Sequence, residues 1–231
     1  MKKGGTSHIE TILSFVIFMA VLTFALYFFS PSDSTRLVDS SLTYGFREIE
    51  RNTSVDVEIF SISVVGTGGN SVIGFGVAGI PTEKKSRVED INGNVVGSWR
   101  DADVVYFNVS SMENFYNVEL NEEFVESPLA NGVFDENYYE IASSEKKEVI
   151  SEKKFAELGA FYDADYNSLK KMFNLPNRVQ IGFSLEFADG SSINAEREIP
   201  DGFEVFSDKR RAEILRRSGE REFGELNVWV W

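Results

Sequence analysis

An apolar run near the beginning of the chain, from Ile12 to Phe29, most constrains what the rest can become. One serine and one threonine interrupt it. As an α-helix rising ~1.5 Å per residue, the run spans ~27 Å, close to the thickness of the hydrocarbon core of a bilayer. Lys2 and Lys3 precede the run, so the positive-inside rule places the N-terminus in the cytoplasm and the remaining chain outside the cell. We expect a single-pass membrane protein whose first helix contacts membrane lipid.

The composition limits the functions that the external part can have. The chain has 231 residues, enough for a membrane helix and a folded domain of about 200 residues. Its formal charge is −14, whereas nucleic-acid binding requires clustered Lys and Arg, so we expect no nucleic-acid partner. There is no cysteine, and the single histidine, His8, precedes the apolar run. These omissions argue against Cys-His and Ser-His-Asp catalysis and most zinc sites in the external part. We expect no enzyme activity, no cofactor and no metal site.

The hydrophobic pattern changes twice after the membrane run. Pro31 kinks or ends the first helix, because proline cannot continue the hydrogen-bond ladder. Within residues 35–50, four apolar residues recur at helical spacing: Val38, Leu42, Phe46 and Ile49. From Ser54 onward, segments with the two-residue period of strands alternate with turn residues. The predicted fold class is α+β, with a long hydrophobic N-terminal helix kinked near Pro31. A β-rich head of mainly antiparallel sheet, with one or two packed helices, follows it.

Local patterns place several elements of the head. Asn92-Gly93 is a strong hairpin-turn signal. Residues 179–187 alternate strictly between apolar and other residues and predict the clearest half-buried strand. We expect a helix over 146–162 and then a further helical turn, capped by Asp165. Additional strands are expected at 203–207, 211–216 and 225–231.

The residues between the basic leader and the apolar run form a specific pattern. Gly5 ends the leader, Thr6 follows it, and Glu10 stands at the mouth of the apolar helix. This pattern resembles the class III signal of type IV pilins and archaeal pilin-like proteins, in which a basic leader ending in Gly is removed and a Glu is fifth in the mature chain. The resemblance implies that a prepilin-type signal peptidase uses Lys3 and Gly5 and cuts before Thr6. It also implies that Glu10 pairs with the Thr6 amine of a neighbouring subunit.

The resemblance suggests an organisation and a function. Residues 1–5 would be a cleaved leader, 6–30 the transmembrane and filament-core helix, 31–50 an amphipathic helix or stalk, and 51–231 the extracytoplasmic head. The expected function is a structural subunit, a pilin or minor pilin, of a type IV pilus-like cell-surface filament. Its partners would be other pilin-like subunits, contacted through the N-terminal helix. The alternative is a membrane-anchored extracellular binding module that does not polymerise.

The energetics of Glu10 agree with an assembly role but leave a simpler reading open. A carboxylate within hydrocarbon costs ~2.5–3.5 kcal/mol on insertion scales, so a compensating partner is needed. The ammonium of a neighbouring subunit would be such a partner. Alternatively, Glu10 lies at the headgroup level beside Lys2 and Lys3, as in an ordinary signal anchor, and costs little.

Other polar features suggest surface contacts. Asn52 and Asn108 begin Asn-X-Ser/Thr triplets, which are glycosylation acceptors, in the part predicted to be outside the cell. Residues 113–140 contain acidic residues and no basic ones, and they form either a solvated face or a surface for cations or glycans. A basic cluster between Lys209 and Arg221 either meets the acidic stretch of a neighbouring subunit or consists of exposed hairpin charges.

Overall fold

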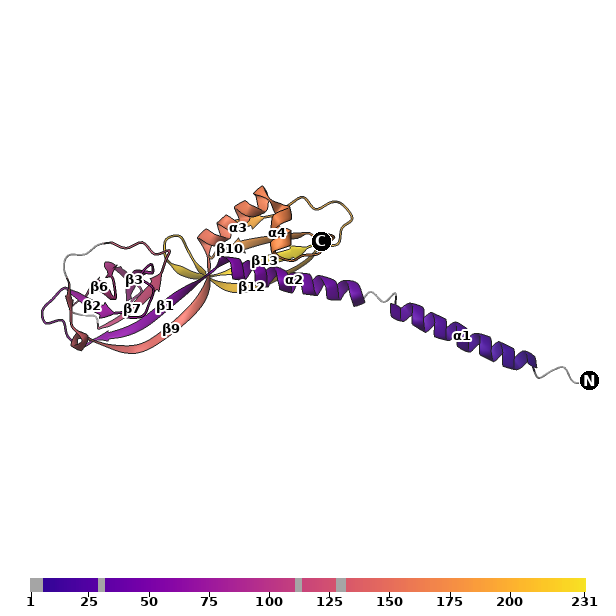
Figure 1. Ribbon diagram of the computed structural model, residues 1–231, viewed down its shortest axis with the longest axis horizontal. Helices are drawn as coiled ribbons and strands as arrows, with labels where there is room; N and C mark the ends of the chain where they lie inside the picture. The colour runs from indigo at the N-terminus through magenta and orange to yellow at the C-terminus, as the bar shows by residue number, and fades with distance from the viewer. Residues whose placement is uncertain (1–5, 29–31, 111–113, 128–131) are drawn as a thin grey trace, which may run out of the picture.

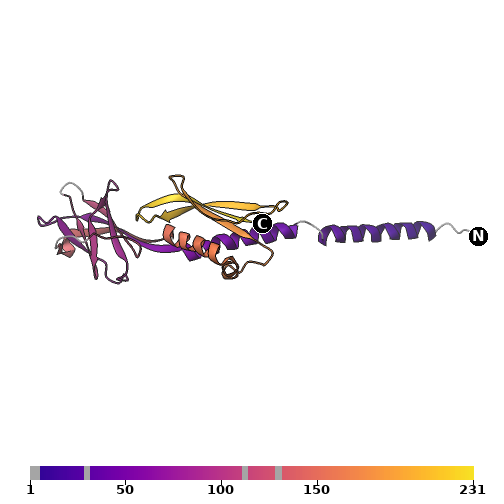
Figure 2. The same cartoon turned by 90° about the horizontal axis from the view of Figure 1, so that it is seen from above.

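The chain has the predicted α+β fold in a computed structural model that describes residues 6–28, 32–110, 114–127 and 132–231. The kink predicted near Pro31 lies outside the described residues. α1 is followed along the long axis of the molecule by two lobes, the first of which contains the second helix, α2 (Figure 1). We call the lobe that contains α2 the proximal lobe and the lobe at the far end the distal lobe. Figure 2 shows the same order from above.

The proximal lobe combines the second helix with the C-terminal part of the chain, and the middle of the chain builds the distal lobe. α1 (Thr6–Phe28) precedes both lobes. The proximal elements are α2 (Ser32–Thr53), α3 (Glu152–Ala164), α4 (Tyr166–Met172), β10 (Ile181–Glu186), β11 (Ser192–Ala195), β12 (Phe206–Leu215) and β13 (Arg221–Val230). The distal elements are β1 (Ser54–Val64), β2 (Val72–Gly76), β3 (Lys85–Asp90), β4 (Val95–Val96), β5 (Ser98–Asp101), β6 (Val104–Asn108), β7 (Phe115–Asn121), β8 (Val133–Phe134), the 3-10 turn η1 (Glu136–Tyr138) and β9 (Tyr139–Ser151).

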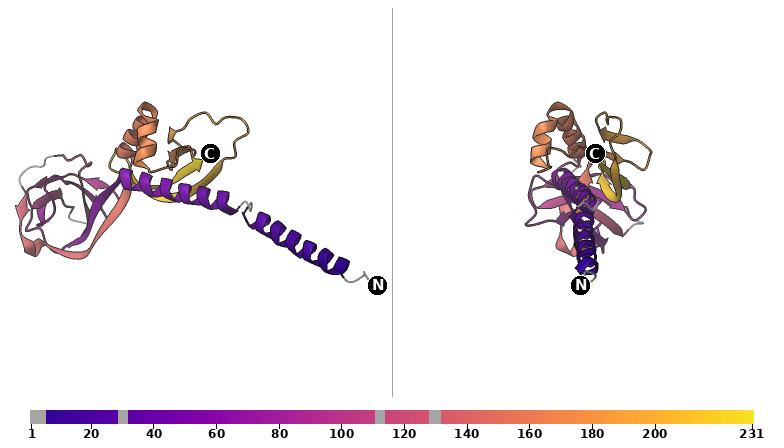
Figure 3. Two further views of the ribbon diagram at one scale, coloured as in Figure 1. Left: turned by 45° about the vertical axis from the view of Figure 1, so that its right-hand side comes forward. Right: turned by 90° about the vertical axis from the view of Figure 1, so that its right-hand side faces the viewer.

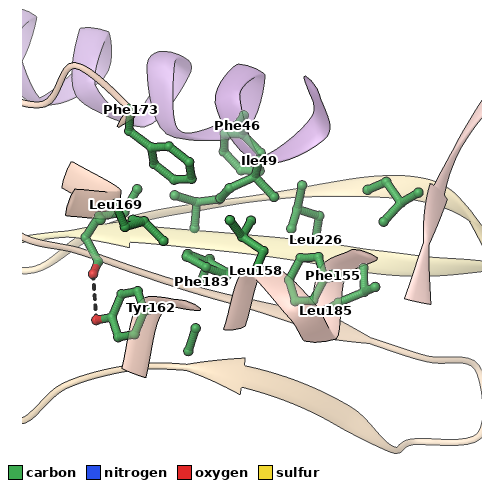
Figure 4. Packing of buried hydrophobic residues seen from close by; sticks show 14 of the residues in the cluster. Phe46, Ile49, Phe155, Leu158, Tyr162, Leu169, Phe173, Phe183, Leu185 and Leu226 are labelled. Atoms are coloured by element: carbon green, nitrogen blue, oxygen red, sulfur yellow. Dashed lines mark hydrogen bonds between the residues drawn. The ribbon is translucent and has the colours of Figure 1, made fainter. Parts of the chain in front are cut away.

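α2 is the amphipathic helix expected from the sequence, and its apolar stripe lies in the proximal core. Phe46 and Ile49 are fully buried, and Val38 and Leu42 pack against the same cluster. Figure 4 shows Phe46 and Ile49 pointing from α2 into this cluster. A Cβ atom at Gly45 would lie 2.9 Å from Cδ1 of a sheet isoleucine, so the absence of a side chain allows the close approach.

The proximal sheet is antiparallel, in the order β11-β10-β13-β12, and its core side faces the helices. β10 is the strand predicted over 179–187, and its residues Ile181, Phe183 and Leu185 are fully buried. Phe155 of α3 meets Phe183 edge-on, with ring centroids 5.6 Å apart. The prediction that this strand is half-buried was wrong, because β10 is buried along most of its length on both faces. Trp229 of the neighbouring strand covers the other face at Gly182.

The distal lobe is a sandwich of two groups of strands. The larger sheet continues as β9-β1-β7-β3-β4, and β5-β6-β2-β8 form a separate sheet. Buried residues of both groups form one cluster, which includes Ile62, Phe75, Phe107 and Tyr116. The hairpin signal at Asn92-Gly93 is confirmed, because it joins β3 to β4 and Gly93 has a φ of 81°.

A narrow junction connects the lobes. β9 and β12 run parallel, and two residue pairs join them, Ile150 with Ile214 and Ser151 with Leu215. A small buried cluster lies at this junction: Val57, Ile59, Phe124, Val149 and Leu215. α2 ends at Thr53 and β1 begins at the next residue, so the helix enters the distal lobe without a loop.

The predicted extents of one helix and two strands were wrong. The helix expected over 146–162 begins at Glu152, because the preceding residues extend β9 alongside β1 as far as the Ser54–Ile150 pair. The strands expected at 203–207 and 211–216 are one strand, β12, which pairs continuously with β13. Charged residues in the middle of β12 obscured its continuity in the sequence.

Candidate functional site

α1 carries the features that the sequence analysis associates with a membrane. Its segment Ile9–Leu26 has a mean hydropathy of 2.3, and none of it is buried by the rest of the chain. By length and composition, this segment could be a membrane span or a signal sequence. Glu10 is exposed, and it is the single charged residue of the segment. The helix therefore presents an apolar surface with one carboxylate near its N-terminal end.

The residues predicted to direct processing lie at or before the start of this helix. Lys3 and Gly5 are outside the described residues. Thr6 is the first residue of α1, and Glu10 follows it by four positions, a rise of ~6 Å along the helix. The pairing between Glu10 and the Thr6 amine joins two chains, and it stays a prediction.

The two predicted glycosylation acceptors differ in their surroundings. Asn52 is exposed in the last turn of α2, but its side-chain amide donates to the carbonyl of Glu48 at 2.6 Å. Thr53, the middle residue of that triplet, is fully buried, and its hydroxyl donates to the carbonyl of Ile49 at 2.8 Å. Asn108 is exposed at the end of β6. Both asparagines are exposed, but the serine that completes the triplet is exposed at Ser110 and only partly exposed at Ser54.

Several members of the basic cluster contact carboxylates of their own chain. Arg221 contacts Glu119, within the acidic stretch, and Glu213 on β12, the latter at 2.5 Å. The guanidinium of Arg216 lies 3.0 Å from the carboxylate of Glu152. Much of this basic charge is therefore neutralised inside the chain, a possibility that the sequence analysis did not consider.

Glu119 is the buried centre of a charge network between the lobes. It is 1% exposed on β7, so it requires the adjacent Arg221 as a counter-charge. Arg87 and Glu89 of β3 lie 2.8 Å apart nearby, and Arg87 also donates to the carbonyl of Gly219. Burial raises the pKa of Glu89 and outweighs the opposing effect of the Arg87 guanidinium. The network thus links distal strands to the β12–β13 hairpin, and part of the acidic stretch is structural.

The described residues contain no cluster of three or more His, Asp or Glu side chains that could hold a metal ion. Asp165 has a structural use at the start of α4: its carboxylate accepts the backbone N–H of Ser168 at 3.1 Å, which is the predicted cap. The hydroxyl of Tyr162 donates to the carbonyl of Ile181 at 2.9 Å, and burial raises its pKa (Figure 4). These groups support the proximal core.

One concave site was missed by the sequence analysis. It lies beside α4, has a volume of about 490 Å³, and brings Lys170 and Lys171 together with Arg197. The two lysines looked like ordinary helix-surface residues, and Arg197 lies just after β11, well beyond α4 in the sequence. The chain reversal between β10 and β11 brings Arg197 back to α4, and no local sequence pattern signals that proximity.

The comparisons with known proteins give no further assignment. No family model matches this chain, and the searches of curated proteins and of solved structures found no match either.

Proposed function

We propose that this protein is a pilin-like structural subunit, held in the membrane by α1 and then assembled into a cell-surface filament through that helix. The observation that carries the proposal is the succession of two helices with different surroundings (Figure 3). α1 is apolar and uncovered, whereas α2 lies with its apolar stripe on an antiparallel sheet. A long N-terminal helix that serves the membrane or filament core with one half and the head with the other is what the resemblance to pilins implies.

The exposed apolar surface of α1 explains why the helix would need either lipid or other subunits. Nothing in the described chain covers Ile9–Leu26, and leaving such a surface in water is unfavourable by ~25 cal/mol per Å². Lipid would cover it before assembly, and the α1 helices of neighbouring subunits would cover it in the filament. Glu10 enters an apolar environment in both states, so a partner ammonium at Thr6 of a neighbour would favour the assembled state.

The first test is the N-terminal mass of the chain recovered from membranes of cells that produce it. A mature chain that begins at Thr6 supports the proposal, because removal of residues 1–5 distinguishes a pilin-like subunit from a plain signal anchor. A chain that begins at Met1 or Lys2 contradicts it and favours the membrane-anchored binding module that does not polymerise.

The second test concerns assembly. Glu10→Ala should abolish or strongly reduce filaments, counted by electron microscopy and in the fraction sheared from cells, while the chain still accumulates in the membrane. Ser14→Ala, one helical turn further along α1, is the matched control and should assemble normally. Normal filament yield from Glu10→Ala would show that the proposed pairing with Thr6 is wrong.

A further inference from the structure

The concave site beside α4, which we call the α4 pocket, has an unusual charge for this chain. The whole protein has a formal charge of −14, yet three cations and no carboxylate line the pocket. The lining residues are Tyr166, Asn167, Lys170, Lys171, Leu175, Asn177, Gln180 and Arg197. The remaining polar groups are amides and a hydroxyl, all of which can donate hydrogen bonds.

Lys170 is the most buried cation of the pocket and has little compensation. It is 7% exposed, and its ammonium donates to the backbone carbonyl of Asn177 at 2.8 Å. An ammonium has three donors, and the described part of the chain provides no carboxylate within ion-pair distance of this one. Burial accordingly lowers the pKa of Lys170. Besides that carbonyl, the ammonium meets the ring of Tyr166, whose centroid lies 5.8 Å away, and neither contact supplies a negative charge. A buried ammonium without a counter-charge is unfavourable unless an anion approaches it.

Tyr166 holds both Arg197 and Gln180 in place. The guanidinium of Arg197 lies over the Tyr166 ring, 4.1 Å from its centroid. Stacking uses the face of a guanidinium and leaves its N–H groups at the edge. The Tyr166 hydroxyl donates to Oε1 of Gln180 at 2.9 Å, so the amide nitrogen of Gln180 remains as a donor. The donors are therefore oriented before any ligand arrives.

Cations near the C-terminal hairpin, by contrast, are paired with carboxylates of the same chain. Arg216 and Arg221 each contact more than one carboxylate, and exposed Lys209 contacts Glu225 at 2.8 Å. Lys170 and Arg197 make no such ion pair in the described ranges, although acidic residues outnumber basic ones 37 to 23. Their convergence on one concave surface is the feature that requires an explanation.

We propose that the α4 pocket binds a phosphate-bearing ligand through Lys170, Lys171 and Arg197. Three cations exceed what one carboxylate needs, whereas a phosphoryl group carries nearly two negative charges and three acceptor oxygens. A volume of about 490 Å³ is in the range of small-ligand pockets and larger than phosphate alone requires. The phosphate could belong to a soluble compound or to a lipid headgroup. This site does not depend on the filament proposal, because it uses neither α1 nor assembly.

The test is calorimetric titration of the full chain in an uncharged maltoside detergent at low ionic strength. The probes are pyrophosphate, glycerol phosphate and a short-chain phosphatidate. Saturable binding of pyrophosphate is expected, weakening as salt is raised. Phosphatidate that binds more tightly than glycerol phosphate identifies a lipid headgroup as the source, whereas equal or weaker binding identifies a soluble compound. Absence of saturable binding for all three probes overturns the proposal.

Charge-removing variants locate the binding. Lys171→Gln and Arg197→Gln should each raise the Kd about tenfold or more, as expected for loss of a charge-assisted hydrogen bond. Lys153→Gln removes one positive charge from an exposed position on α3 and should leave the Kd unchanged. Lys171 is itself exposed, so its replacement should preserve the fold, which the melting temperature checks. Equal Kd values for Lys171→Gln, Arg197→Gln and Lys153→Gln would place the binding elsewhere and overturn the proposal.

Discussion

Gly224 on β13 is the residue where the packing of the proximal sheet leaves least room. A Cβ atom there would lie 2.2 Å from the backbone oxygen of Glu186 and 2.5 Å from Cδ1 of Ile214. Backbone cannot move aside as the end of a flexible side chain can. The absence of a side chain at this position is therefore a requirement of the strand pairing around it.

Gly224→Ala should lower the free energy of unfolding by about 2–4 kcal/mol, because the central strand must shift to accommodate the methyl group. Urea unfolding followed by circular dichroism measures the change. Gly66→Ala is the control, since a Cβ atom there meets nothing within 4 Å. A loss below about 1 kcal/mol at Gly224 would mean that the strand relaxes more easily than the close contact indicates.

Asp165 gives a pH-dependent prediction at the same scale. Its hydrogen bonds to Ser168 lower its pKa from the ordinary value of 3.8. A carboxyl group with a lowered pKa in the folded state contributes stability above the unfolded pKa, and this contribution is lost as the pH falls through the folded pKa. Asp165→Ala should therefore melt at a lower temperature than the wild type at pH 7, and the difference should shrink below pH 3.8. A difference that is constant down to pH 2 would exclude the ionised carboxylate as its source.

At the scale of single elements, Ser151 marks the change from β9 to α3. Its hydroxyl accepts the backbone N–H of Lys154 at 3.1 Å and donates to the carboxylate of Glu123 at 2.7 Å. Ser151 is fully buried. One serine thus begins the helix and also ties it to the acidic stretch of the distal lobe.

Ser151→Ala should destabilise the chain by about 1–3 kcal/mol, because it removes the helix cap and leaves Glu123 without that donor. Thermal and urea unfolding measure the loss. Ser143→Ala, at an exposed position in the middle of β9, should change stability by less than about 0.5 kcal/mol. Equal effects at the two serines would contradict the capping role.

Elements with a strong hydrophobic period could be predicted from the sequence, whereas an exposed strand and a site built by long-range contacts could not. The stripe on α2 and the alternation of β10 follow from which side faces the core, a local property. β9 lacks such alternation because much of it is exposed, so residues 146–151 looked helical next to α3. The α4 pocket escaped prediction for a related reason, since it needs Arg197 to return from a later strand.

At the scale of the whole molecule, two lobes meet over a narrow junction that one arginine helps to hold. Arg221 lies between Glu119 of the distal sheet and Glu213 of β12. Glu119 is almost completely buried, so removing Arg221 would leave an unpaired charge in the interior.

Arg221→Met should lower the free energy of unfolding by about 3–5 kcal/mol, and the double variant Arg221→Met/Glu119→Leu should recover most of the loss. Denaturant unfolding of the three chains provides the comparison. Lys209→Met, which breaks an exposed ion pair with Glu225, should cost less than about 1 kcal/mol. A double variant no more stable than the single one would mean that packing, rather than an unpaired carboxylate, causes the loss.

The loopless passage from α2 into β1 has a mechanical consequence. A pull on the distal lobe, resisted at α1, travels along the backbone of β1, because Thr53 and Ser54 are consecutive residues of a helix and a strand. β1 is paired with β9 over its full length, from Ser54–Ile150 to Val64–Tyr139. The load therefore acts parallel to the strands and is shared by many hydrogen bonds at once, instead of opening them one after another. Such a lobe resists stretching along the axis of the molecule far better than it resists peeling from its side.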